Sequence, residues 1–175
     1  GQTIADAVTV EDPAIQPGSP QSHARHLDGR ASWWISTRPT PGAANQIEVE
    51  KDLVLNEIHF NPKLLLPTGI PDRSPERGEF LEIHNRSART ISLDGYRLSS
   101  GFQYAFGHGT SVPPGGFLVV ARDPRFVRET YALAPEIVVG PPETATPEAL
   151  DSFGMLRNRG ERIRLEDPLG NTADE

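Results

Sequence analysis

The chain has 175 residues, a formal net charge of −7 and no cysteine. Its length allows one ordinary domain with a flanking segment, or two small domains. The lack of cysteine excludes disulfides, thiolate metal sites and a cysteine nucleophile. Charges of both signs are interspersed, so nothing draws the whole chain to nucleic acid or to an anionic membrane. No apolar run approaches the roughly 20 residues of a membrane span.

The N-terminal part predicts one strand followed by a long, turn-rich segment. Residues 1–10 alternate between apolar and polar side chains, which is typical of a half-buried strand. The loop that follows contains His23 and His26, which we expect to be exposed to solvent. Pro41-Gly42 predicts a turn further on, and we place a domain boundary between residues 45 and 50.

From residue 51 the sequence changes to short strands at close spacing. Strands are expected at 53–60, 79–85, 90–93, 96–98, 102–106, 117–121 and 137–139, with a hairpin formed by 155–156 and 163–165. One helix is expected at 125–132, with Asp123 as its N-cap and Pro124 in its first turn. Asp94-Gly95 is a strong hairpin-turn signal. About eight short strands with one short helix indicate an all-β sandwich.

Five segments of this second part resemble lamin tail domains, and they come in the family's order. The five segments are 53–62, 79–85, 91–98, 112–120 and 156–165. His84 stands where the family usually has an aromatic residue. The resemblance implies that residues 50–175 form an immunoglobulin-like β-sandwich.

The N-terminal part resembles the same family in an unexpected place. Residues 1–8 resemble the family's last strand, and residues 34–45, which end in Pro-Thr-Pro-Gly-Ala-Ala-Asn, resemble the tail that follows that strand in bacterial copies. Residues 170–175 resemble the same strand beginning again. We therefore interpret residues 1–45 as the end of a preceding copy, or alternatively as a permuted closing strand of the same sandwich.

This interpretation leaves the last strand of the 50–175 copy truncated, in a tandem or multi-domain context. An unpaired sheet edge would remain unless another segment covered it. Residues 3–10 have the pattern to pair there, beside residues 163–165.

Two groups of side chains are candidates for ligand contact. They are Arg157, Arg159, Arg162, Arg164, Trp33 and Trp34. The arginines form a basic edge that could contact an anion or an acidic polysaccharide. Alternatively they line a solvated strand face whose charge Glu161 and Glu166 offset. The two tryptophans could present a platform for a sugar or a protein, or could anchor a chain end with one ring in a core.

We assign no catalytic, cofactor-binding or metal-binding residue. Glu57, His59, Glu82 and His84 lie on strands that the family pairing brings together, but no spacing such as His-Glu-x-x-His supports a metal site. Hydrogen bonding within the sheet is the alternative role for these side chains. The Asn-Arg-Ser sequence that begins at Asn85 matches an N-glycosylation acceptor, a pattern that is frequent by chance. The sequence contains no nucleophile elbow or phosphate-binding loop.

These patterns favour a non-catalytic interaction or spacer module of a larger secreted or cell-surface bacterial protein. We expect no enzyme activity, no cofactor and a protein or polysaccharide partner at the cell surface. Bacterial copies of this family often accompany extracellular enzymes. The resemblance therefore leaves a second interpretation open, an accessory domain of a nuclease, phosphoesterase or spore-coat-type kinase whose catalytic domain lies outside this chain.

Overall fold

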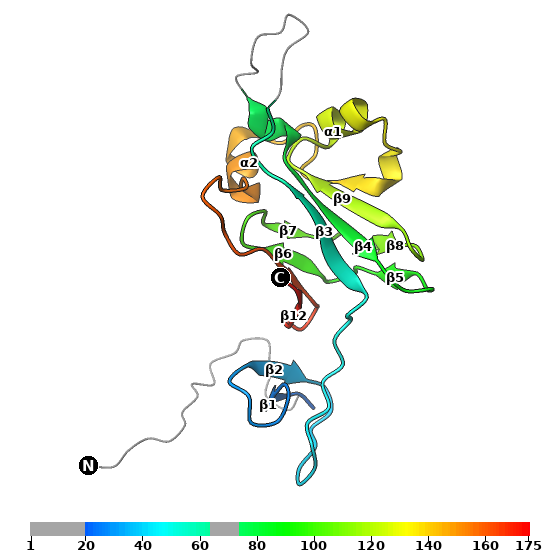
Figure 1. The fold of residues 1–175 in the computed structure, drawn as a ribbon, viewed down its shortest axis with the longest axis vertical. Coiled ribbons are helices and arrows are strands. Elements are labelled where there is room, and N and C mark those ends of the chain that lie inside the picture. Colours follow the sequence, from blue (N-terminus) through cyan, green and yellow to red (C-terminus); the bar gives the residue numbers. More distant parts are fainter. Residues whose placement is uncertain (1–19, 64–73) are drawn as a thin grey trace, which may run out of the picture. The chain divides into compact units, whose positions relative to one another are not determined.

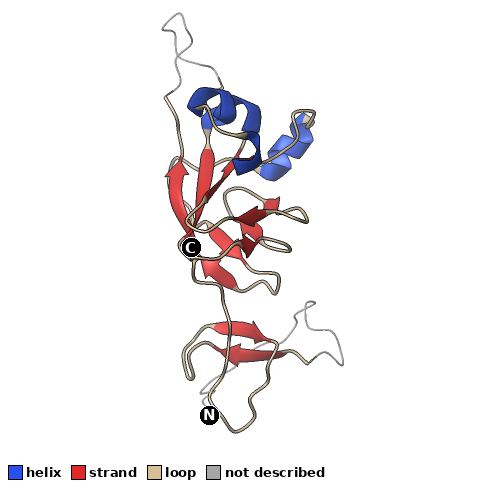
Figure 2. Ribbon diagram, turned by 90° about the vertical axis from the view of Figure 1, so that its right-hand side faces the viewer, coloured by secondary structure: helices blue, strands red, loops and turns tan. Residues whose placement is uncertain are grey.

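A computed structural model describes residues 20–63 and 74–175 of the chain (Figures 1 and 2). The strand predicted within residues 1–10 lies outside these described residues. The chain divides into two compact units, Gly1–Glu48 and Val49–Glu175. Among the described residues, no helix has the length and apolar character needed to cross a membrane. The interpretation of the first unit as the end of a preceding copy stays a prediction.

The described part of the first unit is built around a short antiparallel hairpin. Strand β1 (Ser22–Arg25) pairs with strand β2 (Trp33–Ser36), and Ala24 and Ile35 are its buried apolar residues. The expectation that His23 lies in a solvent-exposed loop is wrong, because it is half-buried on β1, opposite Ile35. Pro41-Gly42 forms the predicted turn, with the Ala43 N–H donating to the Thr40 carbonyl oxygen at 3.1 Å.

The second unit contains two four-stranded sheets and a two-stranded ribbon (Figure 1). The first sheet has the order β10-β9-β4-β3 and consists of β3 (Leu53–His59), β4 (Phe80–Asn85), β9 (Phe117–Ala121) and β10 (Val138–Val139). The second has the order β12-β11-β6-β7 and consists of β6 (Arg97–Ser99), β7 (Tyr104–Ala105), β11 (Arg164–Glu166) and β12 (Thr172–Asp174). The ribbon pairs β5 (Ile91–Ser92) with β8 (Ser111–Val112).

Short helices and 3-10 turns complete the second unit. They are η1 (Pro75–Gly78), α1 (Pro124–Tyr131), η2 (Pro135–Ile137) and α2 (Pro147–Phe153). The predicted all-β sandwich is confirmed, although the described part of this unit has ten strands and two α-helices instead of about eight strands and one helix.

Strand β9 shows how the two apolar layers form. Leu118 and Val120 point into the core between the sheets, while Val119 and Ala121 pack on the opposite face. Helix α1 covers that opposite face with Val127. The prediction of a strand buried on both faces is therefore confirmed for four of its five residues, since only Phe117 is exposed.

Helix α1 begins where its capping signal predicts. The Asp123 carboxylate accepts a hydrogen bond from the Phe126 N–H at 3.0 Å, and Pro124 occupies the first turn. Helix α2 was not predicted, although Thr146 caps it in the same way. Its seven residues are too few for a helical period to stand out.

The predicted hairpin at Asp94-Gly95 is wrong in its pairing. The turn forms, with the Tyr96 N–H donating to the Leu93 carbonyl oxygen at 3.0 Å and Gly95 at φ +78°. However, β5 pairs with β8 and β6 pairs with β11 and β7, so the turn carries the chain from the ribbon to the second sheet. A two-residue turn fixes the reversal but not the partner of either strand.

The predicted hairpin around Asn158-Arg159 is also wrong in part. Gly160 adopts the expected positive φ of +83°, and β11 covers most of the second strand. Residues 155–156 form no strand, because the Leu156 N–H donates to the buried Glu79 carboxylate at 2.9 Å instead of to a neighbouring backbone.

Asn85, at the end of β4, is fully buried and holds three segments together. Its Nδ2 donates to the carbonyl oxygens of Arg89, Val112 and Pro113 at 2.7–3.0 Å. Its Oδ1 accepts from the N–H and the hydroxyl of Ser87 at 2.9 and 2.7 Å. A glycan on this nitrogen would be incompatible with these hydrogen bonds, so in this fold the Asn-Arg-Ser segment forms a turn.

Replacing Asn85 should therefore destabilise the second unit. We expect Asn85→Ala to lower the free energy of unfolding by about 2–4 kcal/mol, because it leaves several buried polar groups without partners. Urea unfolding followed by circular dichroism measures the change. Asn158→Ala, at an exposed turn position, is the matched control and should change the stability by no more than about 0.5 kcal/mol. Equal effects of the two substitutions would contradict this role for Asn85.

Candidate interaction surfaces

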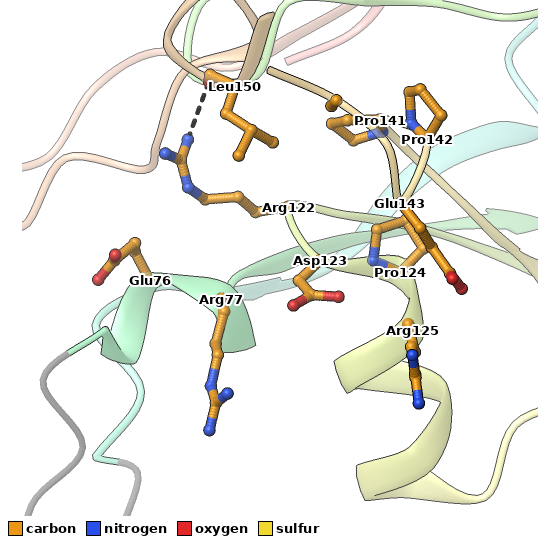
Figure 3. Close-up of a pocket in the computed structure, with 11 residues that line it drawn as sticks. Glu76, Arg77, Arg122, Asp123, Pro124, Arg125, Pro141, Pro142, Glu143 and Leu150 are labelled. Carbon is orange, nitrogen blue, oxygen red and sulfur yellow. Dashed lines mark hydrogen bonds between the residues drawn. The ribbon is translucent and has the colours of Figure 1, made fainter. Parts of the chain in front are cut away.

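A cleft of about 350 Å³ lies at the end of the sandwich where α1 begins (Figure 3). Three segments form it: η1, the junction of β9 with α1, and the connection from β10 to α2. Its lining residues include Glu76, Arg77, Arg122, Asp123, Arg125 and Glu143. The side chains of both charge signs make it a polar cleft with no net preference for anions or cations.

Most of the charged groups of this cleft already have structural partners. Arg122 donates from Nη1 to the carbonyl oxygens of Leu150 and Gly154, and it thereby caps the end of α2 (Figure 3). The Arg77 guanidinium lies 4.1 Å from the centre of the Phe126 ring. Arg125 pairs with Glu129 at 2.9 Å. These contacts hold the helices in place, so the cleft offers few free groups for chemistry.

Glu79, which directly precedes β4, is 4% exposed. Burial raises the pKa of its carboxyl, while the hydrogen bond from Leu156 and the charge of Arg122 partly oppose that shift. A buried carboxyl with a raised pKa can mark an acid–base site. Here it accepts a backbone N–H and joins β4 to the segment after α2, so the geometry gives it a structural role.

The four predicted arginines fall into two pairs. Arg162 and Arg164 both pair with Glu175, at 3.7 and 3.1 Å. Arg157 and Arg159 are exposed on the turn before β11, and their guanidinium groups pair with no other side chain in the described part of the chain. The second pair therefore provides the free positive charge of this edge.

Beside these arginines runs a groove that sequence reasoning missed. Two adjoining hollows of about 470 and 200 Å³ follow the outer edge of β3. Ile58, Glu161 and Ile163 line both hollows, Leu55 lines the first and Phe60 the second. Ile58 and Phe60 are 47% and 51% exposed, which is unusual for apolar side chains at the end of a core strand. The nearly continuous apolar run of 53–60 indicated the strand but not which of its edges stays open.

The two predicted tryptophans lie on β2 of the first unit. Trp33 is 39% exposed, and the Arg25 guanidinium lies 4.3 Å from its ring centre. Trp34 is half-buried and contacts the His26 ring at 4.9 Å. One ring is thus partly covered and the other partly available.

The side chains considered for a metal site do not converge on one point. They are Glu57, His59, Glu82 and His84. Glu57 and Glu82 face each other on β3 and β4, but the histidines lie toward opposite ends of this strand pair. Each histidine Nδ1 is 3.1 Å from a backbone carbonyl oxygen. In residues 20–63 and 74–175, no group of three or more His, Asp or Glu side chains is placed to hold a metal ion.

Comparison with known proteins agrees with this architecture. Residues 47–175 match the family model of the Lamin Tail Domain. The chain belongs to this family. The resemblance drawn from the five sequence segments is therefore confirmed, and with it the immunoglobulin-like fold of the lamin tail domain. The family is non-enzymatic, which indicates a non-catalytic interaction module.

Other comparisons add little to the lamin tail domain match. A crystal structure of a DUF4876 family protein from Bacteroides thetaiotaomicron VPI-5482 is similar with a TM-score of 0.33 and 17% sequence identity. The similarity covers 43% of this chain and 25% of that chain. No curated protein matches the chain.

The raised pKa of Glu79 gives a prediction for stability. The folded lamin tail domain holds this proton more tightly than the unfolded chain, whose value is near 4.5. The contribution of Glu79 to stability is therefore present below pH 4.5 and is lost as the pH rises through the raised pKa. We expect the Glu79→Gln variant to gain stability relative to the wild type across this window, since its amide oxygen still accepts the Leu156 N–H.

Urea unfolding of both proteins over a pH series measures this difference. Glu136→Gln, at an exposed position, controls for the loss of one negative charge. A constant difference between wild type and Glu79→Gln at every pH would show that the Glu79 proton is not linked to folding.

Proposed function

We propose that this chain is a non-catalytic interaction and spacer module of a larger secreted or cell-surface bacterial protein. The observation that carries the proposal is that residues 47–175 form a lamin tail domain, a non-enzymatic fold. Charged residues of the cleft where α1 begins support it, because Arg122 and Asp123 cap helix ends and Arg125 forms an ion pair instead of surrounding a reaction site. The partner is a protein or a polysaccharide at the cell surface.

The alternative function is an accessory domain of an extracellular enzyme. In that case a nuclease, phosphoesterase or spore-coat-type kinase domain would be encoded in the same gene. Sequencing the parent gene outward through both ends separates the two functions. A signal peptide with further copies of the Pro-Gly-Ala-Ala-Asn segment supports the spacer module. A neighbouring hydrolase or kinase domain supports the accessory role.

The contact surface we propose is the exposed edge that carries Arg157 and Arg159. The chain as a whole is acidic, with a net charge of −7, so it should repel an acidic polysaccharide unless a local basic site binds it. Two guanidinium groups that are free of ion pairs can each form charge-assisted hydrogen bonds to a carboxylate.

We expect the double variant Arg157→Ser/Arg159→Ser to bind polygalacturonate about tenfold more weakly than the wild type, because one lost charge-assisted contact is worth about 1.5 kcal/mol or more. Retention on immobilised polygalacturonate over a salt series measures the change.

Arg125→Ser/Arg128→Ser is the matched control, since it removes the same net charge from helix α1. Equal losses in the two double variants would show non-specific electrostatics. Absence of wild-type retention would remove acidic polysaccharides as partners of this edge.

A further inference from the structure

A hollow of about 760 Å³ lies directly beside Arg157. Two turns form most of its walls. One is the turn between β6 and β7, with Ser100 and Gly101, and the other is the turn before β11, with Arg157 and Gly160. We call it the turn hollow. Its volume falls within the roughly 300–1,000 Å³ that is usual for ligand sites in proteins.

The first wall of the turn hollow is fixed against the end of helix α2. The Gln103 N–H donates to the Phe153 carbonyl oxygen at 2.7 Å, which holds the turn between β6 and β7 in place. Gly154 packs so closely on this turn that a Cβ there would stand 2.6 Å from the Gly101 carbonyl oxygen. A larger residue than glycine at position 154 would therefore displace the wall.

The second wall of the turn hollow is closed by its own hydrogen bonds. Glu161 Oε1 accepts from the Arg157 N–H at 2.6 Å, and the Gly160 N–H donates to the Arg157 carbonyl oxygen at 3.1 Å. Both walls thus have an ordered backbone before any ligand arrives. Such preorganisation lowers the entropic cost of binding.

The side chains that line the turn hollow combine polar groups of several kinds with one apolar group. The Arg157 guanidinium only donates hydrogen bonds, whereas the Gln103 amide and the Ser100 hydroxyl both donate and accept them. The Glu161 carboxylate has further lone pairs with which it can accept a hydroxyl group. Met155, which is 52% exposed, supplies an apolar surface.

This combination fits a uronate sugar better than it fits other anions. A uronate carries a carboxylate for an arginine, hydroxyl groups for an amide and a carboxylate, and an apolar ring face for Met155. A bare phosphate or sulfate ion would use the guanidinium alone and would be repelled by Glu161. A nucleic-acid base would lack a stacking surface, because none of the described residues that line the turn hollow is aromatic.

We propose that the turn hollow binds one uronate residue of an acidic polysaccharide, with the carboxylate on Arg157 and the hydroxyl groups on Gln103 and Glu161. Arg159, two positions further along the turn, then contacts a neighbouring residue of the polymer. The inference rests on the proposed role of the Arg157 and Arg159 edge. It adds a site that recognises the sugar ring as well as the charge.

Isothermal titration calorimetry of the full chain with trigalacturonate tests recognition of the sugar. Tricarballylate, which has the same number of carboxylates but no sugar ring, is the matched probe. We expect tricarballylate to bind about tenfold more weakly, because it offers neither hydroxyl groups nor ring faces to the turn hollow. Equal affinities overturn the proposal, since charge alone would then account for binding. Absence of trigalacturonate binding overturns it as well.

Two exposed amide side chains provide a matched pair of variants that locate the site. Gln103 lines the turn hollow, whereas Asn158 lies on the turn before β11 and is not one of the lining residues. We expect Gln103→Ala to raise the Kd for trigalacturonate about fivefold, because a hydrogen bond to the sugar is lost. Asn158→Ala should leave the Kd unchanged. Equal effects of the two substitutions overturn the assignment to the turn hollow.

Retention on immobilised polygalacturonate separates a failure of this inference from a failure of the proposed contact edge. If the wild type is retained and Arg157→Ser/Arg159→Ser is not, the edge binds the polymer. Should Gln103→Ala and Asn158→Ala then behave alike toward trigalacturonate, the edge stands and the turn hollow is not a sugar site. A wild type that is neither retained nor binds trigalacturonate overturns both.

Discussion

The strands of the second unit are only two to seven residues long, so many of its backbone groups must find hydrogen-bond partners outside the sheets. Buried side chains supply them. The Asn85 amide donates to carbonyl oxygens around β8. The Glu79 carboxylate accepts from the Leu156 N–H. The Asp167 carboxylate accepts from the N–H groups of Leu169 and Asn171. Because unpaired buried backbone groups are strongly destabilising, these few polar side chains determine where each loop runs.

This constraint also explains why the charged residues of the polar cleft offer little chemistry. Arg122 satisfies carbonyl oxygens at the end of α2, and Asp123 satisfies an N–H at the start of α1. A side chain that holds a helix end in place cannot also move a proton or orient a substrate without releasing that helix. The surfaces that remain available are the turn before β11 and the edge of β3, where contacts with other molecules disturb no internal bond.

Local signals were enough to predict the elements that depend on neighbouring residues. Asp123-Pro124 identified α1, and the apolar run 117–121 identified β9. Prediction failed where the partner is distant in sequence. Leu156 lies 77 residues from Glu79, so nothing near it indicated that its N–H would leave the sheet.

The same limit applied to the candidate surfaces. The four arginines were visible as one cluster, but only the structure shows that Glu175 pairs with Arg162 and Arg164. The groove could not be predicted, because it exists only where one particular strand edge stays unpaired. A period of two identifies the two faces of a strand, and it says nothing of which neighbour stands on either side.

The β3 edge is protected over part of its length and open over the rest. Asn56 has no partner in the register with β4, and a bulge of this kind bends an edge strand and interrupts further pairing. Next to this bulge, the Asp174 carboxylate accepts a hydrogen bond from the Leu55 N–H. Beyond the bulge the apolar Ile58 and Phe60 are exposed, and neither the bulge nor the Asp174 contact covers them. The bulge therefore limits how far another strand could pair along this edge, where a longer free edge would promote aggregation.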